Sequence, residues 1–284
     1  MYLKAPAIVL AIGFVFASQN AASDPAPGLE QIWVTHGFSS PEGVAVVEDT
    51  LLISNVVGDA TDKDGLGWIS RVSKEGKILE EKWIEGLNAP KGMAAHNGLL
   101  YVADIDTFHI INLETGERLN SFMIQGAGFL NDVTVWNGEV YAADSARKTI
   151  HKLDENGSRP WLTAPVLSGV NGLLGHGGRL IAAAMTSGQL LSIDAAGKIE
   201  VLASGMVDAD GVAALGHGSF LVSSWTGRIW HVEGDGTVTS ILDTEAEGVN
   251  QNDLTGVGSL VVVPNWSPGT VTAWRLITTD GAAH

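Results

Sequence analysis

Six polar residues recur at nearly constant spacing, and each one directly precedes a short apolar segment. Two of them are carboxylates, three are amides and one is an ammonium. The positions are Glu42, Lys91, Asn131, Asn171, Asp210 and Asn252. Carboxylate and amide oxygens are the ligands that Ca²⁺ prefers, so this set could bind calcium if the fold brought its members together. Zinc or copper is not the expected metal, because the chain has no Cys and none of these positions holds a His.

Lys91 distinguishes this set from a simple cation site, because a divalent cation repels an ammonium. Beside a metal, Lys91 would have to point away or bind an anion above the ion. The alternative is a metal-free ring, in which Lys91 pairs with Glu42 or Asp210 and the Asn amides cap neighbouring backbone groups. The number and type of oxygen ligands favour the metal, and the alternative stays open.

The spacing of these residues predicts the fold that would bring them together. Successive positions lie 49, 40, 40, 39 and 42 residues apart, and propeller blades of four strands repeat about every 40–45 residues. Each copy continues with a tight turn, such as Asn97-Gly98 or Asn137-Gly138, and with further strand-like segments. No segment of the mature chain shows convincing helical periodicity. We therefore expect an all-β, six-bladed β-propeller with the six residues around one mouth of its central channel.

The two ends of the repeat predict how the ring closes. The sixth copy stops after its third strand, near residues 271–276, and a strand-like segment at residues 31–35 precedes the first copy. We expect this N-terminal strand to complete the last blade, because the pairing covers both terminal edges. An open β-solenoid would not predict such a displaced strand.

The N-terminal residues have the pattern of a secretory signal peptide. Lys4 is followed by an apolar stretch at residues 5–17 and by small residues at 21–23, so we expect cleavage between Ser23 and Asp24. The apolar stretch is shorter than the roughly 20 residues of a spanning helix. We therefore expect residues 24–284 to form a single propeller domain that is periplasmic or secreted and has no membrane anchor after cleavage.

The charge of the chain limits its partners. The formal net charge is −16, which favours cations and disfavours nucleic acid and anionic membranes. We expect a monomer that binds a small molecule. Without Cys, disulfides cannot contribute to its stability.

Four of the repeated motifs resemble those of the family that includes gluconolactonases, senescence-marker protein and luciferin-regenerating enzyme. The resemblance covers essentially the whole mature chain. The matching segments are Ser40-Pro41-Glu42-Gly43, Asn131-Asp132, Asn171-Gly172-Leu173 and Asp210-Gly211. It implies a calcium-dependent six-bladed propeller with one catalytic Ca²⁺ in the channel, bound by Glu42, Asn131, Asn171 and Asp210. Sugar lactonases usually place an Arg two residues before the third-blade Asn, where this chain has Phe129.

The implied activity is hydrolysis of a lactone, ester or phosphotriester. Asp210 would act as general base or nucleophile, and we expect Lys91 to stabilise the oxyanion that develops. We expect the loops on the same face to contact substrate. The predicted contacts are Phe108, Phe129, Met185, Trp225, Asn252 and Trp266.

Two questions stay open in the sequence. The first-blade loop carries Asp59, Asp62 and Asp64, but the spacing of a calcium-binding loop is absent, so a solvated acidic loop is favoured over a second Ca²⁺ site. The alternative function is a non-catalytic propeller that binds a small ligand or a protein partner at the channel mouth. Lys91 and Phe129 favour this alternative, and the four matched ligand positions favour the hydrolase.

Overall fold

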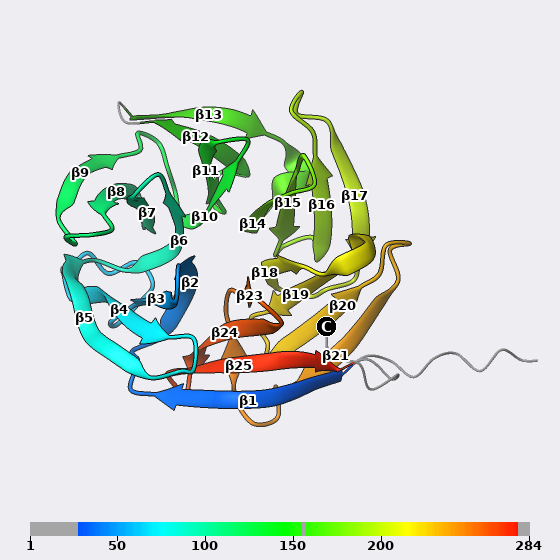
Figure 1. Cartoon of the computed structure of the whole chain (residues 1–284). Helices are drawn as coiled ribbons and strands as arrows, with labels where there is room; N and C mark the ends of the chain where they lie inside the picture. The colour runs from blue at the N-terminus through cyan, green and yellow to red at the C-terminus, as the bar shows by residue number, and fades with distance from the viewer. Residues whose placement is uncertain (1–27, 155–156, 278–284) are drawn as a thin grey trace, which may run out of the picture.

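The computed structural model describes residues 28–154 and 157–277. They form six antiparallel sheets that are arranged as blades around a central axis (Figure 1). The predicted six-bladed β-propeller is therefore confirmed. The expected signal peptide, residues 1–23, lies outside the described residues.

Blades 1 to 5 each contain four consecutive strands, with the first strand innermost. Blade 1 contains β2 (Pro41–Val47), β3 (Thr50–Asn55), β4 (Gly67–Ser73) and β5 (Ile78–Leu87). Blade 2 contains β6 (Pro90–His96), β7 (Leu99–Asp104), β8 (Thr107–Asn112) and β9 (Arg118–Met123). Blade 3 contains β10 (Leu130–Trp136), β11 (Glu139–Asp144), β12 (Thr149–Asp154) and β13 (Gly157–Thr163).

The next two blades repeat this order. Blade 4 contains β14 (Val170–His176), β15 (Arg179–Ala184), β16 (Gln189–Ile193) and β17 (Ile199–Ser204). Blade 5 contains β18 (Ala209–Ala214), β19 (Phe220–Ser224), β20 (Arg228–Val232) and β21 (Val238–Asp243). Two 3₁₀ turns connect strands: η1 (Pro165–Leu167) lies between β13 and β14, and η2 (Gly216–Gly218) lies between β18 and β19. No helix among the described residues is long and apolar enough to cross a membrane.

Blade 6 is built from both ends of the chain. Its strands are β22 (Asn250–Gln251), β23 (Thr255–Val257), β24 (Leu260–Ser267), β25 (Thr270–Ile277) and β1 (Gly28–His36). Strands β1 and β25 pair antiparallel along their length and form the outer edge of the blade (Figure 1). The predicted closure by the N-terminal strand is thus confirmed. The inner strand of this blade is split, because residues 252–254 interrupt the ladder between β22 and β23.

The hairpins that join the first two strands of a blade explain the repeated turn residues. Both turn residues have positive φ at Asn97-Gly98 (50° and 76°) and at Asn137-Gly138 (52° and 76°). Two-residue turns of this kind match the twist of the flanking strands, and Asn and Gly tolerate the required backbone conformation. The sequence pattern therefore marks real hairpins at the end of the inner strand.

The apolar core is divided among the blade interfaces. Each of the six neighbouring pairs of blades encloses its own cluster of buried side chains. Between blades 3 and 4, for example, the aromatic rings of Trp136, Tyr141 and Trp161 lie 5.1–5.7 Å apart by centroid. This packing fixes the angles between blades and therefore the positions of the inner strands around the channel.

Candidate functional site

All six residues predicted from the repeat line one cavity, at the mouth of the channel where the inner strands begin. Its volume is about 630 Å³, which is within the size range of small-molecule sites. The ring residues come from all six blades, so only the closed propeller brings them together.

A local irregularity in the inner strands directs the ring residues toward the channel. In blades 1 to 5 the pairing of the inner strand with its neighbour shifts at the ring residue, for example between Pro41 and Val44 and between Ala209 and Val212. Irregularities of this kind re-aim side chains at the ends of strands. In two blades a serine hydroxyl accepts the backbone N–H that the shift leaves unpaired: Gly43 donates to Ser54 Oγ, and Gly211 donates to Ser223 Oγ, both at 2.8 Å.

The residue after each ring position sets how closely the inner strands approach. Four of these residues are glycines, and a Cβ at Gly172 would lie 2.3 Å from the backbone oxygen of Asp210. The other two are Asp132 and Asp253. Asp132 accepts N–H groups from Val133 and, across the blade boundary, from Leu173 at 2.6 Å. The inner strands are therefore joined below the ring by close backbone contact and, between blades 3 and 4, by the buried carboxylate of Asp132.

Asp132 and Asp253 also line a second cavity of about 270 Å³ farther along the channel. Burial raises the pKa of Asp253 to about 7, and burial together with the charge of Asp253 raises the pKa of Asp132 well above its ordinary value. Asp132 belongs to one of the repeated motifs, but no role was predicted for either residue from the sequence. Their position directly after a ring residue, where the other blades have Gly, is the signal that could have found them.

The two ring carboxylates, Glu42 and Asp210, are buried. Glu42 is 9% exposed and Asp210 is 5% exposed. Among the described residues, neither carboxylate accepts a hydrogen bond or forms an ion pair. Burial raises the pKa of both carboxyls well above the ordinary value, and for Glu42 the nearby positive charge of Lys91 opposes this rise. A buried carboxylate without a donor requires either a proton or a cation.

The ring amides add further oxygens. Asn131 donates its Nδ2 to Ser145 Oγ at 3.4 Å, and Asn252 donates its Nδ2 to Pro41 O at 2.9 Å. Asn171 is 3% exposed and its amide has no hydrogen-bond partner within the described ranges. Over the same residues, no group of three or more His, Asp or Glu side chains could bind a metal. A metal in this ring would therefore depend on amide oxygens in addition to the two carboxylates.

Lys91 reaches the cavity from β6 and is 1% exposed. Its Nζ donates to Ala60 O at 2.9 Å and to Ala89 O at 3.2 Å, and it stands 4.7 Å from the centroid of the Phe129 ring. Burial lowers the pKa of Lys91, and the charge of Glu42 opposes that lowering. No carboxylate of the described chain lies within ion-pair distance of Nζ. The ammonium is thus held by backbone carbonyls, and not by the carboxylate pairing that a metal-free ring would be expected to have.

Four of the predicted apolar contacts lie on the cavity wall: Phe129, Met185, Trp225 and Trp266. Trp225 and Trp266 come from neighbouring blades and meet with ring centroids 5.4 Å apart at 62°. The prediction for Phe108 is wrong. Only Ile105 and Asp106 separate β7 from β8, so Phe108 falls within β8 and is fully buried in the core between blades 2 and 3.

The first-blade loop has the features expected of a solvated acidic loop. Asp62 Oδ2 accepts the N–H of Asp59 at 2.9 Å, and Asp64 Oδ1 accepts the N–H of Leu66 at 2.9 Å. The carboxylates therefore stabilise turns within the loop. The loop also supplies Ala60, whose carbonyl holds Lys91.

Sequence analysis missed a set of residues that position the loops before the inner strands. Asp104 accepts the N–H groups of Asn88 and Ala89 at 2.8 and 2.7 Å and contacts His109 Nε2 at 3.0 Å. In the next blade, Asp144 accepts the N–H groups of residues 128 and 129 at 2.9 and 3.1 Å. The repeated Ala-Asp at residues 103–104 and 143–144, at the end of the second strand, was the available signal.

Solved structures share this architecture at low sequence identity. A gluconolactonase from Xanthomonas campestris is 15% identical with a TM-score of 0.65, and the alignment covers 92% of this chain and 93% of that one. A virginiamycin B lyase from Staphylococcus aureus is 15% identical with a TM-score of 0.64, covering 89% of this chain and 100% of that one. No protein-family profile and no curated protein sequence matches the chain. The likeness establishes the six-bladed propeller fold, which hosts both lactonase and lyase chemistry in these neighbours.

Proposed function

We propose that this chain is an exported, calcium-dependent hydrolase of the lactone or ester type, with phosphotriesters as a related substrate class. The observation that supports the proposal is the pair of buried carboxylates, Glu42 and Asp210, that meets no donor within the described residues. The amide oxygens of Asn131 and Asn171 complete an oxygen-rich set at the same cavity. Such a set fits one Ca²⁺, and the structural likeness to a gluconolactonase agrees with the activity.

The three charged ring residues have distinct parts in the proposed reaction, and the Asn side chains complete the metal coordination. Calcium, when bound, polarises the carbonyl or phosphoryl oxygen of the substrate. Asp210 accepts a proton from water or attacks directly, and Glu42 balances the charge of the site. Lys91 has three N–H donors, of which two are directed at Ala60 and Ala89. The third donor is available to the oxyanion that forms on the substrate.

Metal analysis tests the proposal most directly. We expect the purified protein to carry a single calcium ion that a chelator removes. Adding calcium at about 100 times its Kd should then raise the melting temperature by roughly 5–10 °C. A panel of lactones and aryl esters should be hydrolysed only by the calcium-loaded form. Absence of calcium together with an unchanged melting temperature after chelation would contradict the hydrolase.

A binding protein without catalysis is the second candidate. The observation that favours it is the composition of the cavity, whose titratable side chains are Glu42, Lys91 and Asp210 alone. Among the described residues, the cavity lining offers no His and no further acid that could protonate a leaving group. Ligand binding with unchanged affinity in the presence of a chelator, and without turnover of any ester, would support this candidate.

Export is proposed from the N-terminal sequence pattern. We expect the mature protein to begin at Asp24, to be monomeric and to be found in the periplasm or the medium. N-terminal sequencing of the protein recovered from each fraction tests this expectation. An uncleaved chain in the cytoplasmic fraction would contradict it.

A further inference from the structure

We infer that the cavity accepts a ligand whose buried group is aromatic or long and apolar, and that it rejects polyol lactones. This inference rests on the proposed hydrolase for its chemistry, but it concerns binding and can be tested separately. The inference depends on the residues that form the walls of the cavity, whereas the proposed function depends on the polar ring residues.

The walls carry very few hydrogen-bonding side chains. Above the polar ring, the cavity is lined by Phe129, Met185, Trp225 and Trp266 and by small residues. The hydrogen-bonding groups of these walls are the hydroxyls of Ser145 and Thr186 and the two indole N–H groups, which donate but cannot accept. The Ser145 hydroxyl already donates to Val170 O at 2.7 Å. A sugar lactone carries several hydroxyls, and each one that is buried without a partner disfavours binding. An aromatic or alkyl group gives up no hydrogen bonds with water when it binds at these walls, and the burial of its apolar surface favours binding.

Trp225 and Trp266 form a corner that is assembled before any ligand binds. Asn250 Nδ2 donates to Trp225 O at 3.0 Å, which fixes the backbone that carries the first ring. Trp266 packs against the buried cluster of Val56, Ala89 and Ile105. Rigid aromatic side chains provide contact area at a small loss of conformational entropy.

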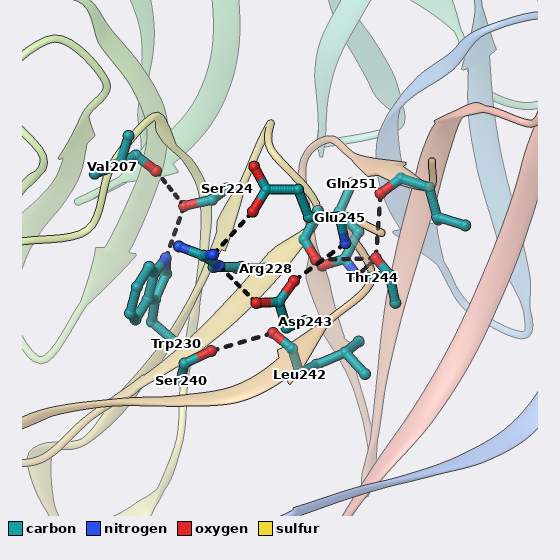
Figure 2. Close-up of polar contacts among 12 residues, drawn as sticks. Val207, Ser224, Arg228, Trp230, Ser240, Leu242, Asp243, Thr244, Glu245 and Gln251 are labelled. Atoms are coloured by element: carbon teal, nitrogen blue, oxygen red, sulfur yellow. Dashed lines mark hydrogen bonds and ion pairs between the residues drawn. The ribbon is translucent and has the colours of Figure 1, made fainter. Parts of the chain in front are cut away.

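The turn that carries Trp225 lies between Ser224, the last residue of β19, and Arg228, the first residue of β20. Figure 2 shows the hydrogen bonds that these two flanking residues make. On one side, Ser224 Oγ donates to Val207 O at 2.6 Å and accepts Trp230 Nε1 at 2.7 Å. On the other side, Arg228 donates to Asp243 Oδ2 at 2.9 Å and to a Glu245 oxygen at 2.8 Å. Trp225 thus lies in a turn whose two ends, Ser224 and Arg228, are held by hydrogen bonds. A side chain that is held in place in this way can select ligands by their shape.

Phe129 adds a further apolar surface to the cavity, next to the ammonium of Lys91. Its N–H is held by Asp144, and its ring shields one side of the Lys91 ammonium. A ligand bound here therefore meets apolar atoms along its body and meets a cationic donor only at the ring. The ligand class that fits is a neutral lactone or ester with one polar end and an aromatic or alkyl substituent.

A panel of δ-lactones tests the inference, with each kcat/KM divided by the rate constant for spontaneous hydrolysis of the same lactone, because their ring esters differ in intrinsic reactivity. The substrates are dihydrocoumarin (aromatic), δ-decalactone (alkyl) and δ-gluconolactone (polyol), all with calcium present. We expect this normalised kcat/KM for the first two to exceed that for gluconolactone at least about 100-fold. Binding without turnover is measured by calorimetry with the lactam analogues of the aromatic and polyol compounds.

Variants of the aromatic corner supply the matched control. Trp225→Leu and Trp266→Leu should each weaken binding of the aromatic lactam about 10-fold, whereas Trp83→Leu, outside the cavity, should leave it unchanged. Circular dichroism confirms that each variant is folded. Binding of the aromatic lactam without hydrolysis of any lactone would refute the hydrolase and retain the inference. Equal or tighter binding of the polyol lactam, no binding of the aromatic one, or an equal loss in Trp83→Leu would each overturn it.

Discussion

The residues at the start of the inner strands are polar or charged, whereas the strands that follow them are largely apolar. Glu42 and Asp210 are buried carboxylates, and the part of the chain that the structure describes supplies no hydrogen-bond donor to either. Buried charges are costly unless they are paired or bind a metal, which supports the proposal that these residues bind a ligand. Lys91 supports the same view, because backbone carbonyls hold it in place without neutralising either carboxylate.

Replacing Asp210 with Asn tests its chemical role. The variant keeps a ligand oxygen but removes the proton acceptor, so we expect kcat to fall at least about 100-fold. Asp235→Asn is the control, because Asp235 lies in the exposed turn between β20 and β21, outside the cavity lining. Its Oδ1 accepts the N–H of Thr237 at 2.9 Å, and an Asn oxygen can accept the same bond. Retained hydrolysis together with retained calcium in Asp210→Asn would remove Asp210 from any chemical role.

The raised pKa values of Glu42 and Asp210 predict the pH dependence of calcium binding. Because both carboxyls bind protons more tightly in the folded protein than in ordinary solution, calcium must displace those protons. The rise in melting temperature that calcium produces should therefore be larger at pH 8 than at pH 5. Thermal melts with and without calcium across this range measure the effect. A rise that is independent of pH would show that these carboxyls are not the ligands.

At the scale of the elements, the end of the second strand positions the loop before the inner strand. Blades 2 and 3 use Asp104 and Asp144 for this purpose, and blade 1 uses Asn55, whose Oδ1 accepts the N–H of Ser39 at 3.1 Å. In blade 2, His109 extends the contact to Ser121 of the outer strand, with 2.7 Å between Nδ1 and Oγ. The ring residue is therefore fixed by side chains that never enter the cavity.

Asp104→Asn should destabilise the protein by about 2 kcal/mol at neutral pH, because it removes the charge from buried hydrogen bonds. Burial alone would raise the pKa of Asp104, but hydrogen bonds from His109 and two backbone N–H groups outweigh burial and lower it. A carboxyl whose pKa is lowered by folding stabilises the protein at any pH above its ordinary, unfolded-state pKa. This contribution disappears as the pH falls through the folded-state pKa. Urea unfolding should show the difference between wild type and variant narrowing toward pH 3. Asp106→Asn, on the surface beside Lys63, should change the unfolding free energy by less than about 0.5 kcal/mol.

The sequence predicted those features that depend on neighbouring residues. Hairpin turns such as Asn97-Gly98 and the ring positions were visible because local backbone geometry repeats with the blade. Phe108 was misplaced because its strand begins after a connection of only two residues, and no local signal separates loop from strand there. The contact between Lys91 and Ala60 could not be predicted, because it depends on the path of the long first-blade loop. The interruption of the inner strand of blade 6 at residues 252–254 was likewise not predicted.

At the scale of the whole molecule, the propeller depends on one closure. Strand β1 pairs with β25 and also reaches blade 1, where Trp33 Nε1 donates to Lys74 O at 3.0 Å and Thr35 Oγ1 donates to Gly76 O at 2.5 Å. A single strand thus joins the last blade to the first. Because all six blades contribute to the cavity, the closure and the site are maintained together.

Removing β1 should therefore abolish both folding stability and binding. A chain that begins at residue 37 leaves the edge of β25 unpaired, and we expect loss of the cooperative melt and aggregation in size-exclusion chromatography. A chain that begins at Gly28 retains β1 and is the control. A synthetic peptide of residues 28–36 should restore the melt, and a scrambled peptide should not. A cooperative melt of the shorter chain without peptide would contradict the role given to β1.

The course of the chain in blade 6 also determines how the molecule can be handled. Inner strands begin at the cavity face and successive strands alternate in direction, so β1 starts and β25 ends on the opposite face, with Gly28 and Ile277 as register partners. A surface or a fusion partner attached at either of these positions would leave the mouth of the cavity directed outward. Joining the two positions by a short linker would allow new termini to be opened in another blade, which would make a circular permutant with the same ring.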